Sequence, residues 1–204
     1  MEPLVDQSQR KILQEFYLLE RAEPDKPREK GKPLKLRGVF SEANKKNQNG
    51  RIYPKPILER EVNKFMQFVR ERRAGAVGEL DHPDVSVVQL ANASHVITDL
   101  HWEGDDLLGE IEVLPTRNGQ TLEALHEAGI RVGLSSRAVG STQRNNEGAE
   151  VVQEDLQLLT FDVVSNPSVS TAMLSENKII LEEIKKNNSL VIINSIIDDI
   201  LNQN

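Results

Sequence analysis

The order of the predicted strands and helices is the feature that most constrains the fold of this chain. Apolar alternation and short apolar runs predict strands within four segments, namely residues 34–43, 86–114, 130–141 and 151–168. Helical spacing predicts two helices between them, over residues 56–73 and 119–129. Because this order contains few strand–helix–strand units, it predicts an α+β fold built on a mostly antiparallel sheet or a partly closed barrel.

The two ends of the chain differ in composition from this central part. Residues 5–22 carry apolar side chains at helical spacing, whereas residues 23–33 hold three prolines, a glycine and charges of both signs. Apolar residues follow helical spacing again after Met173, which predicts a tail whose apolar stripe needs a partner. We therefore expect three parts, namely an N-terminal helix with a charged linker over 1–33, a folded domain over 34–172, and a C-terminal helical tail over 173–204.

Composition argues against several classes of function. The chain has 25 basic and 32 acidic side chains, and this balance disfavours a nucleic-acid-binding surface, which needs a basic face. It has no cysteine, so disulfides and thiolate metal sites are excluded. The N-terminus lacks the basic-then-apolar pattern of a signal peptide, and no apolar run has the length of a membrane span. We expect a soluble cytoplasmic protein with no nucleic-acid partner, no membrane partner and no cofactor.

Two adjacent serines lie in the predicted strand over residues 130–141, which reads IRVGLSSRAVGS. Because neighbouring side chains of a strand point to opposite faces, Ser136 shares a face with Leu134, and Ser135 shares the other face with Gly133. We expect Ser136 to be a hydrogen-bonded filler against the core. Ser135 should point to the open face, where Gly133 leaves room for a substrate backbone. Ser135 is therefore the preferred candidate nucleophile, and Ser136 is the fallback.

A serine nucleophile needs a base to take its proton and a third group to orient that base. His82 has the best context of the four histidines, since Pro83 restricts its backbone to extended geometry and carboxylates nearby favour the imidazolium. Asp162 lies in the middle of an apolar strand, where an unpaired carboxylate is costly, and a histidine N–H would serve as its partner. In the structural alternative, Asp162 caps a turn or pairs with an arginine, and Ser135 and His82 are an ordinary strand serine and loop histidine.

Four motifs follow one another along the chain, namely NxNGRIYP over residues 47–54, GELDHP over 78–83, GLSSRAVGS over 133–141 and FDVVSNPS over 161–168. Together they resemble the prohead core proteases of tailed phages, a family similar in fold to the herpesvirus assembly proteases. The resemblance covers about residues 34–172 and implies a small β-barrel surrounded by helices. It also implies the roles of the site residues, with His82 as general base, Ser135 as nucleophile and Asp162 as orienting acid. The herpesvirus enzymes have a second histidine in the third role.

The same resemblance implies a serine endopeptidase that cleaves scaffold, core and major capsid proteins inside a prohead assembling in the host cytoplasm. Its oxyanion hole is expected to consist of backbone N–H groups, near Arg137 or within residues 165–170. Such proteases cut after the glutamate of a short apolar–x–Glu stretch, so the tail is expected to be a self-cleaved propeptide. Matching stretches in the flanking segments end at Glu15, Glu20, Glu176 and Glu183, and two further matches in the domain end at Glu59 and Glu127. Whether the chain forms a homo-oligomer is left open.

Two other classes of function fit the same residues. A non-catalytic scaffold protein of the prohead would keep the fold with an inactive site and use the tail for assembly. His95, Asp99 and His101 share a strand parity and could line one face, as metal ligands do. A metal-dependent hydrolase would then use His82, His95 and His101. Because HxxxH and HExxH patterns are absent, we expect surface histidines and no metal site.

Overall fold

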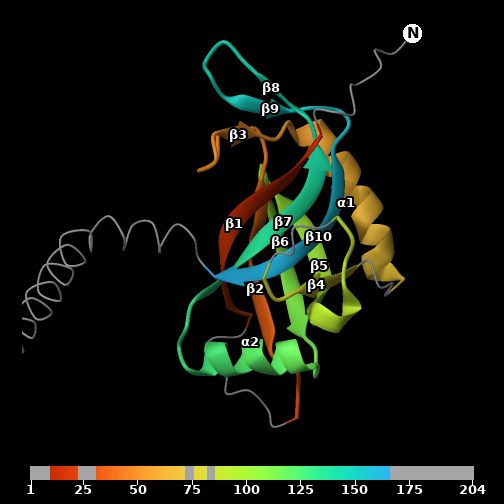
Figure 1. Ribbon diagram of the computed structural model, residues 1–204, viewed down its shortest axis with the longest axis vertical. Coiled ribbons are helices and arrows are strands. Elements are labelled where there is room, and N and C mark those ends of the chain that lie inside the picture. Colours follow the sequence, from red (N-terminus) through yellow and green to blue (C-terminus); the bar gives the residue numbers. More distant parts are fainter. Residues whose placement is uncertain (1–9, 23–30, 72–75, 82–85, 166–204) are drawn as a thin grey trace, which may run out of the picture. The chain divides into compact units, whose positions relative to one another are not determined.

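The structure is a computed structural model that describes residues 10–22, 31–71, 76–81 and 86–165. The predicted C-terminal tail over 173–204 therefore lies outside the described residues. The elements follow in the order β1 (Lys11–Arg21), β2 (Lys35–Glu42), β3 (Arg51–Ile52), α1 (Lys55–Arg70), β4 (Val77–Glu79), a 3₁₀ turn (Leu90–Asn92), β5 (Ala93–Glu103), β6 (Asp106–Val113), α2 (Arg117–Glu127), β7 (Val132–Gly140), β8 (Thr142–Arg144), β9 (Glu150–Val152) and β10 (Gln157–Ser165) (Figure 1). Neither of these helices is long and apolar enough to cross a membrane.

Seven strands form one sheet in the order β10-β7-β1-β2-β6-β5-β4, and each neighbouring pair is antiparallel. The edge strands β10 and β4 come together, because Leu80 forms a parallel bridge with Val163 and the Asp81 N–H donates to the Val163 carbonyl at 2.8 Å. The sheet is thus a nearly closed barrel. The predicted α+β fold with a mostly antiparallel barrel is confirmed.

The core fills the barrel and extends to α1. Phe161 of β10 meets Phe40 of β2 edge to face, with ring centroids 4.9 Å apart, and Phe65 of α1 at 5.6 Å. All three rings are buried, and each such ring stabilises the fold by roughly 2–3 kcal/mol. Helix α1 follows Pro54 and packs against β10 and β5, the strands on either side of the short strand β4. Helix α2 packs against β5 and β6.

The predicted helix over residues 5–22 is wrong for residues 11–21, which form strand β1. This strand pairs with β7 along residues 11–18 and with β2 along residues 19–21. Its apolar side chains lie on both faces of the strand, with Leu13 and Leu19 on one face and Phe16 and Leu18 on the other, so apolar residues recur at helical spacing without a helix. The folded domain consequently begins before Leu34, the predicted boundary.

The first of the four motifs, over residues 47–54, holds β1 in place. Its side chains converge on Glu15, whose carboxylate is 3% exposed. Asn49 Nδ2 donates to this carboxylate at 2.7 Å, and Arg51 Nη1 and the Tyr53 hydroxyl donate at 2.9 Å each. Burial and then the charge of Glu15 raise the pKa of Tyr53 well above its usual range, so the phenol remains a donor. The contacts of this motif therefore have a structural role, which is to fix strand β1 through Glu15.

Candidate active site

The two serines lie on β7 between β1 and β10. Ser135 is directly opposite Asp162 of β10 and Phe16 of β1, whereas Ser136 is opposite Phe161 and Glu15. Directly opposed residues of antiparallel strands project to the same face of the sheet. Ser135 therefore shares a face with the carboxylate of Asp162, and Ser136 shares the other face with the buried ring of Phe161. The two serines face opposite sides, as their parity predicts.

The expectation that Ser135 lies on an open face is wrong. Ser135 is 3% exposed and Ser136 is 5% exposed, so both are buried. The space beside Gly133 is filled, because a Cβ atom at this position would overlap the ring of Phe16. Phe16 belongs to β1, the segment predicted to be a helix outside the domain, and this is why the sequence pattern did not reveal the cover.

Asp162 has the partner that its burial demands, and in the described residues that partner is an arginine. Arg137 Nε lies 2.9 Å from Asp162 Oδ2, and Arg137 Nη2 donates to Asp162 Oδ1 at 3.1 Å. The backbone N–H of Glu79 also donates to Asp162 Oδ1, at 3.0 Å. Asp162 and Arg137 are both 0% exposed, so the pair is screened from water. This pairing is the arginine contact of the structural alternative.

Arg137 makes a second ion pair inside the protein. Its Nη2 donates to Glu79 Oε1 at 2.8 Å, and Glu79 is also 0% exposed. Because β7 has a partner strand on each side of residue 137, the backbone N–H of Arg137 lies within the sheet. An oxyanion donor at Arg137 would therefore require the sheet to open locally. The alternative donors in residues 166–170 lie outside the described residues.

His82 also lies outside the described residues, but Leu80 and Asp81, which lead into it, form backbone hydrogen bonds. The Asp81 N–H donates to the Val163 carbonyl at 2.8 Å, and the Leu80 N–H donates to the Asn92 carbonyl at 3.3 Å. Asp81 has a φ of +65°, a left-handed conformation that aspartate tolerates better than most residues. The residue before His82 is thus attached to β10 one position after Asp162.

His95 is a buried neutral histidine at the same edge of the barrel. Its Nε2 lies 3.0 Å from the Phe161 carbonyl, and its Nδ1 lies 2.9 Å from the Ser94 hydroxyl. Since a carbonyl can only accept, Nε2 carries the proton and Nδ1 accepts from Ser94. Burial lowers the pKa of His95 from 6.5 to about 4, against the opposing attraction of Asp162. Gly78 is required beside it, because a Cβ there would overlap the imidazole.

The predicted common face of His95, Asp99 and His101 is wrong. The register of β5 against β6 shifts between Ile97 and Asp99, and such a bulge changes the side to which later residues point. His95 is consequently buried, whereas His101 is exposed and contacts Asp99 at 2.7 Å. Among the described residues, no group of three or more histidine, aspartate or glutamate side chains could hold a metal ion. The metal-dependent alternative thus has no support in the part of the chain that the structure describes.

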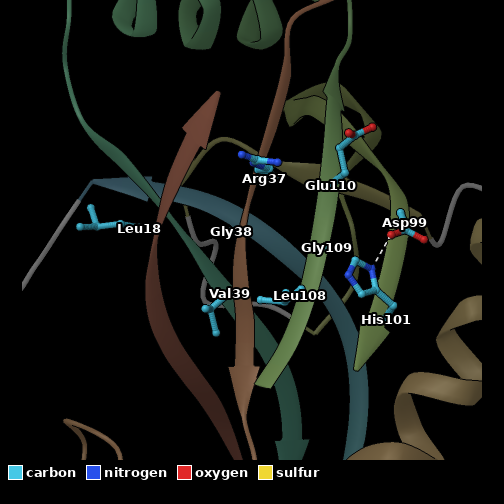
Figure 2. A pocket seen from close by; sticks show the side chains of 9 residues that line it. All are labelled: Leu18, Arg37, Gly38, Val39, Asp99, His101, Leu108, Gly109 and Glu110. Atoms are coloured by element: carbon cyan, nitrogen blue, oxygen red, sulfur yellow. Dashed lines mark hydrogen bonds and ion pairs between the residues drawn. The ribbon is translucent and has the colours of Figure 1, made fainter. Parts of the chain in front are cut away.

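His101 and Asp99 instead line a hollow on the surface of the sheet, as Figure 2 shows. Its volume is about 470 Å³. Leu18 of β1 and Arg37 of β2 lie across this hollow, and Glu110 of β6 lies beside Asp99. None of the predicted catalytic residues that the structure describes lines it. The hollow does border the serine strand, because Leu18 is directly opposite Gly133 of β7.

Sequence reasoning gave no role to Glu79, which the structure places at the centre of the site. The signal was weak, because the sequence did not predict a strand at β4, whereas Asp162 lies in the middle of a predicted apolar strand. Phe16 and Glu15 were missed because their segment was assigned to a helix.

The nearly closed antiparallel barrel matches the fold of a capsid assembly protease. The structure of the bacteriophage T4 capsid assembly protease, gp21, matches it with a TM-score of 0.69 and 30% identity, covering 78% of this chain and 99% of that chain. The prohead core protein protease of Enterobacteria phage T4 is 35% identical over 151 residues, which are 72% of this chain and 70% of the relative. Residues 7–184 match the family described as prohead core protein serine protease.

The chain therefore belongs to the prohead core protein serine protease family. The family resemblance predicted from the four motifs and the enzyme class, a serine protease, are both confirmed.

Proposed function

We propose that the chain is the serine endopeptidase of phage prohead maturation, with Ser135 as nucleophile, His82 as general base and Asp162 as orienting acid. It acts inside the assembling prohead, in the host cytoplasm, on core, scaffold and major capsid proteins. One observation carries the assignment of the site. Ser135 and Asp162 are opposed on one face of the β7–β10 pair, and the residue before His82 is hydrogen-bonded to β10 at Val163.

The geometry supports acyl transfer in two steps. Ser135 Oγ attacks the scissile carbonyl carbon while its proton passes to His82, and His82 then protonates the leaving amine as the peptide bond breaks. Water attacks the resulting ester with His82 again as base, which releases the acid product and restores Ser135. Because Ser135 is 3% exposed, the entering peptide must displace a covering group, and Phe16 lies over the neighbouring Gly133.

The surroundings of Asp162 suit an orienting acid. Arg137 and the Glu79 N–H hold its carboxylate in one orientation, with contacts of 2.9, 3.1 and 3.0 Å. A carboxylate fixed in this way keeps an imidazole in the required tautomer and stabilises the imidazolium formed during reaction. The arginine contact and the catalytic role are therefore compatible, since a carboxylate has lone pairs for both.

We further propose that the enzyme cuts after glutamate in apolar–x–Glu stretches and trims its own chain. The candidate sites differ in accessibility. Glu15 is 3% exposed and, like Glu20, belongs to strand β1 inside the sheet, so cleavage there would require β1 to leave its neighbours. We therefore favour Glu176 and Glu183, in the tail, as the sites of self-cleavage, and the tail as a propeptide.

The test is a pair of serine variants. Ser135→Ala should lose labelling by a fluorophosphonate probe and reduce peptide cleavage by at least about 10³-fold, because the hydroxyl that forms the acyl-enzyme is gone. Ser136→Ala is the matched control, since it makes the same change one residue away on the opposite face, and it should keep labelling. Mass spectrometry of the purified chains should show end trimming in the wild type and not in Ser135→Ala. Cleavage by Ser135→Ala would refute the assignment.

A further inference from the structure

The hollow drawn in Figure 2 lies on the same face of the sheet as Ser135. Leu18 of β1 lines the hollow and is directly opposite Gly133 of β7. Ser135 lies two positions further along β7, and the register against β1 does not change between them. Alternate residues of a strand share a face, and so do directly opposed residues of neighbouring strands. One face of the sheet therefore leads from Ser135 across β1 into the hollow.

Apolar side chains form part of the lining of the hollow. Leu18 is 45% exposed, although β1 is an internal strand of the sheet. Val39 of β2 and Leu108 of β6 are directly opposite each other, half-buried, and line the same hollow. An apolar side chain of a bound peptide would remove part of these three side chains from water, which favours binding.

Arg37 adds a positive charge to the hollow. Its side chain is exposed, and within the described part of the chain its guanidinium forms no hydrogen bond or ion pair. The two carboxylates of the hollow are engaged by neighbouring donors. His101 Nδ1 donates to Asp99 Oδ2 at 2.7 Å, and Lys35 Nζ donates to Oε1 of Glu110 at 2.8 Å. The guanidinium is therefore suited to bind a carboxylate from another molecule through two N–H donors.

The strand register gives the distance from Ser135 to Arg37. Ser135 is opposite Phe16 of β1. Arg37 of β2 is opposite Glu20 of β1, so four residues and two strand spacings separate it from Ser135. At about 3.3 Å per residue and about 4.8 Å per strand spacing, this separation is roughly 16 Å. An extended peptide covers it in about five residues, and the length of the side chains adds one or two more.

The chain's own sequence contains a stretch whose apolar and acidic residues fit this distance. The proposed cut after Glu176 is followed by NKIILEE, in which three apolar residues occupy the third to fifth positions. Glu182 and Glu183 occupy the sixth and seventh. The other proposed cut, after Glu183, is followed by IKKNNSL, which is basic instead. The comparison therefore favours the cut after Glu176 and the part of the substrate that follows the cut.

We propose that the hollow binds the part of a substrate that follows the cleaved bond, with its apolar residues on Leu18, Val39 and Leu108 and a carboxylate on Arg37. The occupant is an extended peptide of the composition found over residues 177–183, apolar and then acidic. The inference rests on the proposed function, because it takes Ser135 as the nucleophile. Arg37 is then a specificity-determining residue that contacts the substrate away from the reacting atoms.

Two synthetic peptides test this on the full-length enzyme. The long peptide carries residues 168–187, and the short one carries residues 168–179 and lacks the acidic pair Glu182 and Glu183. Arg37→Gln should lower kcat/KM for the long peptide about threefold to tenfold, chiefly through KM, because binding energy is lost equally in the ground and transition states. The short peptide should be cleaved as by the wild type. High salt should reduce the difference, since an exposed ion pair is screened.

Exchanging the charges separates recognition from a structural effect. Arg37→Glu should prefer a long peptide that carries Glu182→Lys and Glu183→Lys, whereas the wild type should prefer the unchanged long peptide. Arg144→Glu is the matched control, because Arg144 is an exposed arginine on β8, in the three-stranded sheet. It should keep the wild-type preference.

Binding to an inactive enzyme distinguishes failure of this inference from failure of the proposed function. In the Ser135→Ala background, Arg37→Gln should weaken binding of the labelled long peptide about threefold to tenfold, measured by fluorescence anisotropy. Cleavage by Ser135→Ala would refute the proposed function whatever the hollow binds. With Ser135→Ala inactive, equal affinities with and without Arg37→Gln, or an Arg37→Glu enzyme that keeps the wild-type preference, overturn the inference alone.

Two further outcomes would also overturn the inference. An equal loss of kcat/KM for the short peptide would mean that Arg37 acts on the fold and not on the substrate. A change of oligomeric state in Arg37→Gln, measured by sedimentation, with unchanged peptide binding would mean that the hollow is a contact between copies of the chain.

Discussion

Glu79, His95, Arg137 and Asp162 are all 0% exposed, although their side chains are polar. Three of them are charged and form ion pairs of 2.8–2.9 Å with one another. His95 is satisfied in a different way, by one donor and one acceptor that both require the neutral ring. Burial is therefore tolerated at each residue for a specific chemical reason, and for His95 that reason depends on pH.

His95 should make the stability of the folded protein depend on pH below 6.5. Its pKa is about 4 when folded and near 6.5 when unfolded, so the unfolded chain binds more protons between these values. The free energy of unfolding therefore falls as pH drops from about 6.5 to 4, by roughly 3 kcal/mol in total. His95→Gln should flatten urea-unfolding free energies across this window, whereas His101→Gln, at an exposed position, should not. Equal pH slopes in wild type and His95→Gln would contradict this account.

At the scale of elements, the seam between β4 and β10 is closed largely by side chains. Asp162 accepts from the Glu79 N–H at 3.0 Å, and the Thr160 hydroxyl donates to the Val77 carbonyl at 2.9 Å. Strand β4 has only three residues, so backbone pairing alone cannot hold this edge. Hydrogen bonds from polar side chains of β10 thus replace the backbone hydrogen bonds that would normally join two strands. Strand β10 is also the neighbour of β7, which carries the two serines.

Thr160→Val should weaken this seam. The change keeps the shape of a fully buried side chain but leaves the Val77 carbonyl without its donor, which destabilises the protein by about 1–3 kcal/mol. Thr121→Val on α2 is the control, because its hydroxyl bonds to the Arg117 carbonyl at an exposed position and its loss should matter little. Urea unfolding measures both. A similar loss of unfolding free energy in the two variants would mean that the Thr160 hydrogen bond does not stabilise the seam more than an exposed one stabilises a helix.

The elements that the sequence predicts well are those whose signals are local. Helix α1 follows a proline and has one apolar side, and α2 ends before Gly129, so both are predicted within a few residues of their observed bounds. Strand β1 is not predicted, because it forms a strand only by pairing with β7, which lies far along the chain, and with β2, which lies across a linker. The bulge in β5 likewise depends on its partner β6, and it moved Asp99 and His101 to the outside.

At the scale of the whole molecule, the barrel brings together residues of different motifs, such as Glu79 and Asp162, which are 83 positions apart in the sequence. Parity within one strand predicts that Ser135 and Ser136 face opposite sides, and burial cost predicts a partner for Asp162. The identity of that partner, Arg137, and the role of Glu79 depend on which strands become neighbours. The apolar pattern of a single segment does not reveal which strands become neighbours. The ion pairs between Glu79, Arg137 and Asp162 could therefore not be predicted without the closed sheet.

Removing the first 33 residues should abolish cooperative folding, although the sequence pattern places a domain boundary there. Strand β1 is paired with β7 at eight positions and with β2 at three. Without it, the barrel opens between β7 and β2, and each of these two strands gains an unpaired edge prone to association. The buried side chains of Leu13 and Leu19 and the Glu15 cluster would be lost as well.

The matched comparison is a chain that starts at Arg10 and keeps all of β1. Urea unfolding followed by fluorescence of Trp102 should show a cooperative transition for the full chain and for the chain from Arg10, and none for the chain from Leu34. The reason is topological, since β1 is an internal strand of the barrel and no other described segment lies between β7 and β2. A cooperative transition of the Leu34 chain at the full-length midpoint would mean that β1 is an appendage, and that Phe16 does not cover the Ser135 face.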